Sequence, residues 1–265
     1  MNFSELIQAA RGNPGEIVVP ASWGQGRASF GGVVAALAFE AMRAKVEAGR
    51  PVRSLATTFV GPLEPEVPAS FEAELLREGK AVSQVFCRVM QKGQVVALLQ
   101  GSFGGSRQSV VQMEAEPAPE MKPVADCVEL PFIPGVTPEF TRHLAMRWSI
   151  GGMPFSNSRE RDMGGWVRFR DDRIKEAITE SHLLALVDAW PPATVPHLPV
   201  PAPGSTLTWT IEFVQPLPKL DTHAWCKYRA RIEHARDGYG HAAAALWTPD
   251  GELVAMSRQT VVVFG

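Results

Sequence analysis

The tetrapeptide FVGP at residues 59–62 is matched in the second half of the chain by FVQP at residues 213–216. A second motif, GQVVA at residues 93–97, is matched by GELVA at residues 251–255. The two matches occur in the same order and at nearly the same offset, which indicates a duplicated unit. In a duplicated protein, one copy can retain the catalytic residues while the other copy only forms part of the wall around them.

The composition is that of an ordinary globular protein. The chain has 265 residues, enough for two domains of usual size or one large domain, and 45% of them are hydrophobic. The formal net charge of −2 creates no overall field that would attract nucleic acid or an anionic membrane. A local group of arginines or lysines would still be able to hold an anionic ligand.

Sequence motifs for a metal, a cofactor or a covalent nucleophile are absent. Cys87, Cys127 and Cys226 are widely spaced without a CxxC pair, so free thiols are expected rather than disulfides or a zinc site. The chain contains no GxSxG, HExxH or Walker A motif. Its N-terminus lacks the basic region of a signal peptide, and no apolar run reaches the ~18 residues of a membrane span. We therefore expect a soluble cytoplasmic protein without a metal or a cofactor.

Hydrophobic periodicity predicts three helices. Residues 2–10 carry one apolar stripe. Residues 33–48 form a long apolar helix, which FGG at residues 30–32 opens and Gly49 ends. Residues 178–190 are apolar nearly all round, which is typical of a buried helix, and two prolines stop it.

Alternating and β-branched segments predict antiparallel strands around each long helix. In the first unit these strands are at residues 16–20, 52–60, 69–77, 81–91 and 94–103, and in the second at residues 142–149, 165–169, 206–214, 223–233, 239–248 and 252–264. A proline-rich stretch between the units is typical of a linker. We predict an N-terminal unit over residues 1–105, a linker over residues 106–140 and a C-terminal unit over residues 141–265. A sheet that covers a long central helix, occurring twice, is an α+β plan known as the double hotdog.

Asp188 is the first candidate for chemistry. It lies in the last turn of the second long helix, on the same face as Leu184 and Ala185. Burial and the negative end of the helix dipole both disfavour a charged carboxylate there, so its pKa should rise toward the range of a general base. The alternative is that Asp188 only caps the turn formed by the following prolines.

Gln259 and Thr206 are the next candidates. Gln259 lies in the last strand, where an inward amide would be able to hold a water molecule or a carbonyl group, although a solvated position is the alternative. The duplication places Gly101 at the matching position of the first copy. Thr206 begins a strand and its hydroxyl is able to donate to a carboxylate or water, but threonine is common at strand starts.

Glycines open the first long helix. Gly31 and Gly32 offer unpaired backbone N–H groups that suit an oxyanion or a phosphate, and close packing against the helix start is the alternative. Glu40, in the middle of that helix, is interpreted as a residual or structural carboxylate. His182 is predicted to lie on a different helix face from Asp188, so the two form no catalytic pair.

The order of these motifs resembles that of the TesB-like family, the double-hotdog acyl-CoA thioesterases. The matching stretches are FGG at 30–32, EGKAVS at 78–83 with QKG at 91–93, LVD at 186–188, and DGELVA at 250–255 with SRQ at 257–259. The resemblance covers nearly the whole chain apart from the linker. It implies a catalytic triad of Asp188, Thr206 and Gln259, all in the second unit. Many members read Ser/Thr-x-Asp-His where this chain reads TLTW at residues 206–209, so the Asp-His pair is missing.

The resemblance implies an acyl-CoA thioesterase of lipid metabolism, with an acyl-CoA substrate. The asymmetry between the two copies predicts one active site per chain. Asp188 would activate a water molecule, Thr206 and Gln259 would position it, and Gly31 with Gly32 would stabilise the oxyanion. The missing Asp-His pair leaves a second hypothesis, a non-catalytic acyl-CoA or lipid-binding double-hotdog protein. A hotdog hydratase, which needs an Asp/His pair on one helix, is a third. Because hotdog sheets leave long edges, we expect a homodimer or higher homo-oligomer.

Overall fold

The computed structural model describes residues 1–171 and 175–264. The helices of this part of the chain are α1 (Phe3–Gly12), α2 (Gly31–Arg43) and α3 (Glu180–Asp188), with short 3-10 turns η1 (Ala21–Trp23), η2 (Val124–Asp126), η3 (Glu139–Arg142) and η4 (Val195–His197). The strands of the N-terminal half are β1 (Ile17–Val18), β2 (Gly24–Gln25), β3 (Ala28–Ser29), β4 (Val52–Phe59), β5 (Pro68–Glu78), β6 (Val82–Gln91) and β7 (Gln94–Gly104). Those of the C-terminal half are β8 (Val128–Glu129), β9 (Leu144–Ile150), β10 (Asp162–Phe169), β11 (Gly204–Phe213), β12 (Cys226–Arg236), β13 (Tyr239–Trp247) and β14 (Leu253–Val263).

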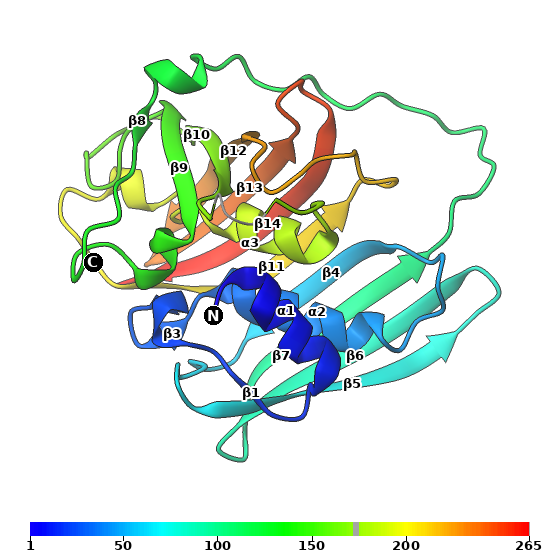
Figure 1. The fold of residues 1–265 in the computed structure, drawn as a ribbon. Coiled ribbons are helices and arrows are strands. Elements are labelled where there is room, and N and C mark those ends of the chain that lie inside the picture. The colour runs from blue at the N-terminus through cyan, green and yellow to red at the C-terminus, as the bar shows by residue number, and fades with distance from the viewer. Residues whose placement is uncertain (172–174, 265) are drawn as a thin grey trace.

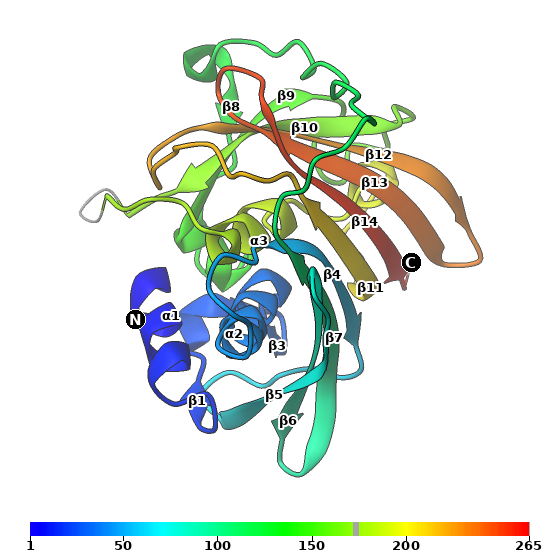
Figure 2. The same cartoon turned by 90° about the vertical axis from the view of Figure 1, so that its right-hand side faces the viewer.

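Twelve of the described strands form one curved antiparallel sheet, in the order β1-β5-β6-β7-β4-β11-β14-β13-β12-β10-β9-β8. The sheet curls around α2 and α3, and α1 covers the side of α2 that faces away from the sheet (Figures 1 and 2). The predicted α+β plan, in which antiparallel strands wrap a central helix twice, is therefore confirmed.

The two halves join at the centre of the sheet, where β4 pairs with β11. The repeated motifs lie there, because Phe59 ends β4 and Phe213 ends β11. Ala56 pairs directly with Thr210, its own counterpart in the repeat. An approximate twofold axis therefore passes through this pair and relates one half of the molecule to the other.

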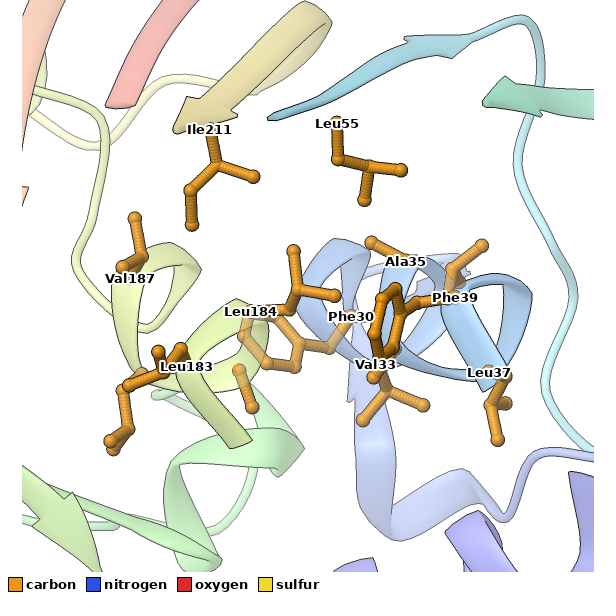
Figure 3. Packing of buried hydrophobic residues seen from close by; sticks show 14 of the residues in the cluster. Phe30, Val33, Ala35, Leu37, Phe39, Leu55, Leu183, Leu184, Val187 and Ile211 are labelled. Carbon is orange, nitrogen blue, oxygen red and sulfur yellow. The ribbon is translucent and has the colours of Figure 1, made fainter. Parts of the chain in front are cut away.

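The same symmetry sets α2 and α3 side by side in opposite directions. The start of α2 lies against the second half of α3, since a Cβ built on Gly31 would be 2.8 Å from Oδ2 of Asp188 and one built on Gly32 would be 3.0 Å from Cα of Ala185. Their apolar residues fill the space beneath the sheet, into which Leu55 of β4 and Ile211 of β11 point (Figure 3). The missing side chain of Gly32 allows this close approach, which brings both helix ends into one site.

Helix α2 begins at Gly31 and ends at Arg43, earlier than the predicted end at residue 48. After Arg43 the backbone tightens, because the N–H groups of Lys45 and Val46 bond to carbonyls only three residues back. The apolar pattern continues through this turn, so periodicity alone extends the helix too far.

The proline-rich stretch between the halves begins as an extended segment on the outside of the molecule (Figure 1). Val110, Val111 and Met113 are fully or almost fully exposed there. Farther along it contains η2 and β8, and β8 pairs with β9. None of the helices in residues 1–171 and 175–264 is long and apolar enough to span a membrane.

Candidate active site

The end of α3 brings a carboxylate and an amide together. Gln259 Nε2 donates a hydrogen bond of 2.9 Å to Asp188 Oδ1. The backbone N–H of Gly32 donates to the same carboxylate, and a Cβ built on Gly31 would lie 2.8 Å from Asp188 Oδ2. The site thus joins the end of α3, the inner face of β14 and the start of α2.

Two helix ends act on Asp188 in opposite senses. The residue lies at the negative end of the dipole of α3, as the sequence indicated, but also at the positive end of the dipole of α2. An N-terminal N–H group that has no partner within its own helix is satisfied by this carboxylate. The carboxylate is therefore anchored in place by the first half of the chain.

The pKa of Asp188 rises to about 7, because burial disfavours the charged form. The hydrogen bonds from Gln259 and Gly32 act against this rise but do not cancel it. A carboxyl group with this pKa is half ionised near neutral pH, which suits a general base. The predicted upward shift of the pKa is thus present in the structure.

Tyr228 on β12 is a neighbour that the sequence did not single out. Burial raises the pKa of its hydroxyl, and the charge of Asp188 raises that pKa further. Its ring stacks on Trp190, with centroids 5.2 Å apart. The signal was present, because strand alternation puts Tyr228 on the same face as the buried Cys226 and Ala230.

Gln259 points inward rather than to solvent. It pairs in register with Ala242 of β13 and with Trp209 of β11, and Trp209 is almost completely buried. Directly opposed residues of antiparallel strands share one face, so Gln259 shares the helix-facing side. No bond to the amide oxygen of Gln259 is found among the described residues, which leaves it able to accept a hydrogen bond from water.

Thr206 shares that inner face but makes no hydrogen bond with the other two residues of the predicted triad. It pairs with the buried Val261, the next inward residue after Gln259 on β14. A register shift between Thr206 and Thr208 places both Thr206 and Trp209 opposite inward residues of β14. Within residues 1–171 and 175–264, the Thr206 side chain bonds to neither Asp188 nor Gln259. Trp209 and Thr208 occupy the places of the missing Asp-His pair, and Thr208 is exposed.

The two glycines at the start of α2 differ in whether their backbone N–H groups have a hydrogen-bond partner. The N–H of Gly32 is taken by Asp188, whereas the N–H of Gly31 has no hydrogen-bond partner in the described parts of the chain. The predicted oxyanion role of Gly31 and Gly32 stays a prediction, and this geometry favours Gly31 for it. Residues 1–171 and 175–264 contain no group of three His, Cys, Asp or Glu side chains arranged to hold a metal.

A second carboxylate lies at the symmetry-related position. Glu40, near the end of α2, is buried and accepts a 2.5 Å hydrogen bond from Ser181 Oγ at the start of α3. Arg11 of α1 holds it through Nε at 2.7 Å and Nη2 at 3.1 Å. Where the other half has Gln259, this half has Gly101, and a Cβ built there would be 2.8 Å from Cε of Met42. The counterpart site is therefore closed by an ion pair and filled by a methionine.

Removal of Arg11 should expose the structural role of this ion pair. Arg11→Leu leaves the Glu40 carboxylate buried with only Ser181 as partner, so we expect the free energy of unfolding to fall by about 2 kcal/mol. Solvent around the half-exposed arginine keeps the loss below that of a fully buried pair. Urea denaturation measures it, and the double variant Arg11→Leu/Glu40→Gln should recover most of the loss. Equal stability of the single and double variants would contradict this coupling.

Comparisons with known protein families identify both halves of the chain. The family described as the acyl-CoA thioesterase N-terminal domain matches residues 19–104, and the acyl-CoA thioesterase C-terminal domain matches residues 124–263. No curated protein is significantly similar to the chain in sequence.

Solved structures with the same fold are numerous. A conserved protein of unknown function with a hot dog fold from Alicyclobacillus acidocaldarius is 25% identical, with a TM-score of 0.81 over 94% of this chain and 92% of that one. The tesB protein of Mycobacterium avium subs paratuberculosis is 18% identical, with a TM-score of 0.75 over 100% of both chains. The acyl-CoA thioesterase II TesB2 of Mycobacterium marinum is 19% identical, with a TM-score of 0.68 over 89% of this chain and 90% of that one. These likenesses confirm the hotdog fold.

Proposed function

Because the chain belongs to the acyl-CoA thioesterase family, we propose that it hydrolyses an acyl-CoA thioester to a free acid and CoA. The observation that carries this proposal is the contact between Asp188, with a pKa of about 7, and Gln259 at the start of α2. A base poised near neutrality beside an unsatisfied amide oxygen is suited to activating one water molecule. This reaction requires no covalent intermediate on the protein.

In the proposed mechanism Asp188 takes a proton from water as the water oxygen attacks the thioester carbonyl carbon. Gln259 donates to Asp188 and accepts a hydrogen bond from the same water through its amide oxygen. The tetrahedral intermediate then collapses, the carbon–sulfur bond breaks, and the departing thiolate takes the proton back from Asp188. Thr206, on the same inner face, contributes a hydroxyl that orients the water once substrate is bound.

The negative charge that develops on the carbonyl oxygen in the transition state needs a hydrogen-bond donor to stabilise it. We assign this role to the N–H of Gly31, because it lies at the positive end of α2 and has no other partner among the described residues. One such donor is typically worth ~3 kcal/mol of transition-state stabilisation. The start of α2 would thus hold the base through Gly32 and the oxyanion through Gly31.

The pH dependence of hydrolysis follows from the raised pKa of Asp188. Only the ionised carboxylate accepts a proton, so kcat/KM should rise with pH and level off above a midpoint of about 7. Below the midpoint, kcat/KM should fall about tenfold per pH unit. Chromatographic measurement of released acid between pH 5 and 9 avoids any pH-dependent thiol reagent. A flat profile, or a rate that falls with increasing pH, would rule out Asp188 as the base.

The direct test of the function is release of free thiol from a panel of acyl-CoAs that differ in chain length and branching. The proposal is supported if at least one acyl-CoA is hydrolysed and this hydrolysis depends on Asp188. Stoichiometric binding without turnover of any member would instead favour the non-catalytic acyl-CoA or lipid-binding protein, to which the missing Asp-His pair also points.

We further propose a cytoplasmic homo-oligomer that acts in lipid metabolism. In the structure β1 covers only the first residues of β5, and Leu75 and Leu76 of the uncovered part of β5 are exposed. An uncovered edge of this kind favours pairing with another chain. Light scattering after size-exclusion chromatography would measure the assembly, and a monomer at micromolar concentration would contradict this expectation.

A further inference from the structure

An open groove of about 530 Å³ lies at the end of the β12–β13 hairpin. Its walls come from the segment at residues 159–161, the turn η4 and the hairpin between β12 and β13. Ile232, Leu198 and Val263 contribute apolar surface, and arginines at positions 159, 161 and 236 contribute guanidinium groups. The groove is thus an apolar trough with a basic rim.

Sheet register places this groove close to the catalytic amide. Ile232 on β12 pairs with Ala242 on β13, and Ala242 pairs with Gln259 on β14. The three residues form one row across the sheet, so Ile232 is two strand spacings from Gln259, on the order of 10 Å. From the other side, Thr194 lines the groove six residues after Asp188. A molecule bound along the groove would therefore end near the side of the sheet that carries Gln259.

Backbone hydrogen bonds hold the two loop walls together. The N–H groups of Phe155, Asn157 and Ser158 donate to the carbonyls of Val195, Leu198 and Pro196, at 3.2, 3.2 and 2.8 Å respectively. Two buried polar atoms of this wall, Thr194 Oγ1 and His197 Nε2, have no hydrogen-bond partner among the described residues. The groove is therefore a built feature of the fold, not a gap between mobile loops.

The rim has an excess of positive charge. Arg159 and Arg236 have no ion-pair or hydrogen-bond partner in the described parts of the chain, and Arg161 Nη1 bonds only to the backbone oxygen of Glu233, at 3.1 Å. Glu233 is the one acidic residue among those that line the groove, and its carboxylate is already paired with Arg258. Three guanidinium groups with no carboxylate partner suit a phosphate better than a hydrocarbon chain.

We propose that this groove binds the phosphorylated arm that carries the acyl group, with its apolar floor against the pantetheine and its arginines on the phosphate. The inference rests on the proposed function and names the carrier side of that same site. A phosphopantetheine arm presents methylene and geminal methyl groups between its two amides and ends in a phosphate, so it offers a partner to the apolar floor and to the basic rim. CoA and a phosphopantetheine-bearing carrier share this chemistry, so the test must separate them.

The test compares three thioesters of one acyl group, carried by CoA, by phosphopantetheine and by N-acetylcysteamine, which lacks any phosphate. The triple variant Arg159→Gln/Arg161→Gln/Arg236→Gln should raise KM for acyl-CoA at least tenfold and leave kcat nearly unchanged. The N-acetylcysteamine thioester should be hydrolysed equally well by both proteins. Arg88→Gln, at an exposed arginine of β6 in the other half, is the matched control and should change nothing.

A loss confined to acyl-CoA would assign the arginines to the nucleotide phosphates, and an equal loss with acyl-phosphopantetheine would assign them to the phosphate common to both carriers. Equal effects on all three thioesters, or none, would overturn the proposed groove. Calorimetric titration with free CoA tests the proposed groove independently of the proposed hydrolysis. Binding that the triple variant loses would support the groove even without hydrolysis, whereas hydrolysis with unchanged CoA affinity would leave the function standing and the groove wrong.

Discussion

Replacement of Asp188 by asparagine should lower kcat for acyl-CoA hydrolysis by about 10³-fold while leaving the protein folded. The amide has nearly the shape of the carboxylate, so the packing at the end of α3 is preserved. It cannot accept a proton from water, and the loss of a general base typically costs 10²- to 10⁴-fold in rate. Thiol release under saturating substrate measures the effect, with Asp126→Asn, an exposed position in η2, as control.

The same substitution should stabilise the protein at alkaline pH. The pKa of Asp188 is about 7 in the folded chain, against an ordinary value near 3.8. The folded state therefore binds the proton more tightly than the unfolded state, and its stability decreases as pH rises from about 4 to about 7. The shift corresponds to at most about 4 kcal/mol, and the asparagine gives up one acceptor, so we expect a net gain of about 1–3 kcal/mol.

Urea denaturation at pH 5 and pH 9 separates the two effects of Asp188→Asn. Between pH 5 and pH 9, the free energy of unfolding should fall more for the wild type than for the variant. A variant that keeps a tenth or more of wild-type kcat would remove Asp188 from the mechanism. A variant that is inactive but also much less stable at pH 9 would show that the carboxylate serves the structure rather than the reaction.

The position of Asp188 was predictable from sequence, but its partners were predictable only in part. Helical spacing places it on a buried face, and strand alternation together with the duplication points to Gln259. Its hydrogen bond to Gly32 depends on α2 and α3 lying antiparallel, which follows from the twofold axis through Ala56 and Thr210. The sequence places Asp188 only at the negative end of its own helix, and the opposing dipole of α2 becomes apparent only from the packing of the two helices.

Tyr228 and the basic groove show a different limit of prediction from sequence. The alternation of β12 indicates that Tyr228 points inward, but nothing in its neighbours along the chain relates it to Asp188. The groove collects Arg159, which precedes β10, and Arg236, which ends β12, and the pairing of these two strands brings the arginines together. A net charge of −2 conceals such a local excess, because acidic residues elsewhere balance it.

The closed counterpart site supports the proposal of one reaction centre per chain. In each half a carboxylate lies at the end of the central helix, against the start of the other helix. Glu40 is paired with Arg11, while Asp188 has no cationic partner among the described residues. Arg11 donates hydrogen bonds to both carboxylate oxygens of Glu40, so this pair already occupies the atoms that would otherwise face a water molecule. The difference between the halves is therefore electrostatic as well as steric.

Gly31→Ala should lower kcat by about 10²-fold with little change in stability. The new Cβ would lie 2.8 Å from Asp188 Oδ2 and 3.1 Å from Cζ of Phe59, so the carboxylate has to move. A displacement of about 1 Å at a reacting group can cost 10²-fold in rate. Alanine is a better helix former than glycine, so the fold itself should not suffer.

The pH profile of this variant distinguishes a displaced base from a general disturbance. Movement of the carboxylate away from the N–H of Gly32 removes a bond that favours its charged form, so the midpoint of kcat/KM should shift above 7. Gly12→Ala, where a Cβ would meet nothing within 4 Å, is the matched control and should keep both rate and midpoint. Unchanged kinetics in Gly31→Ala would mean that the start of α2 does not hold the base. In that case the contact between the halves would contribute to folding alone.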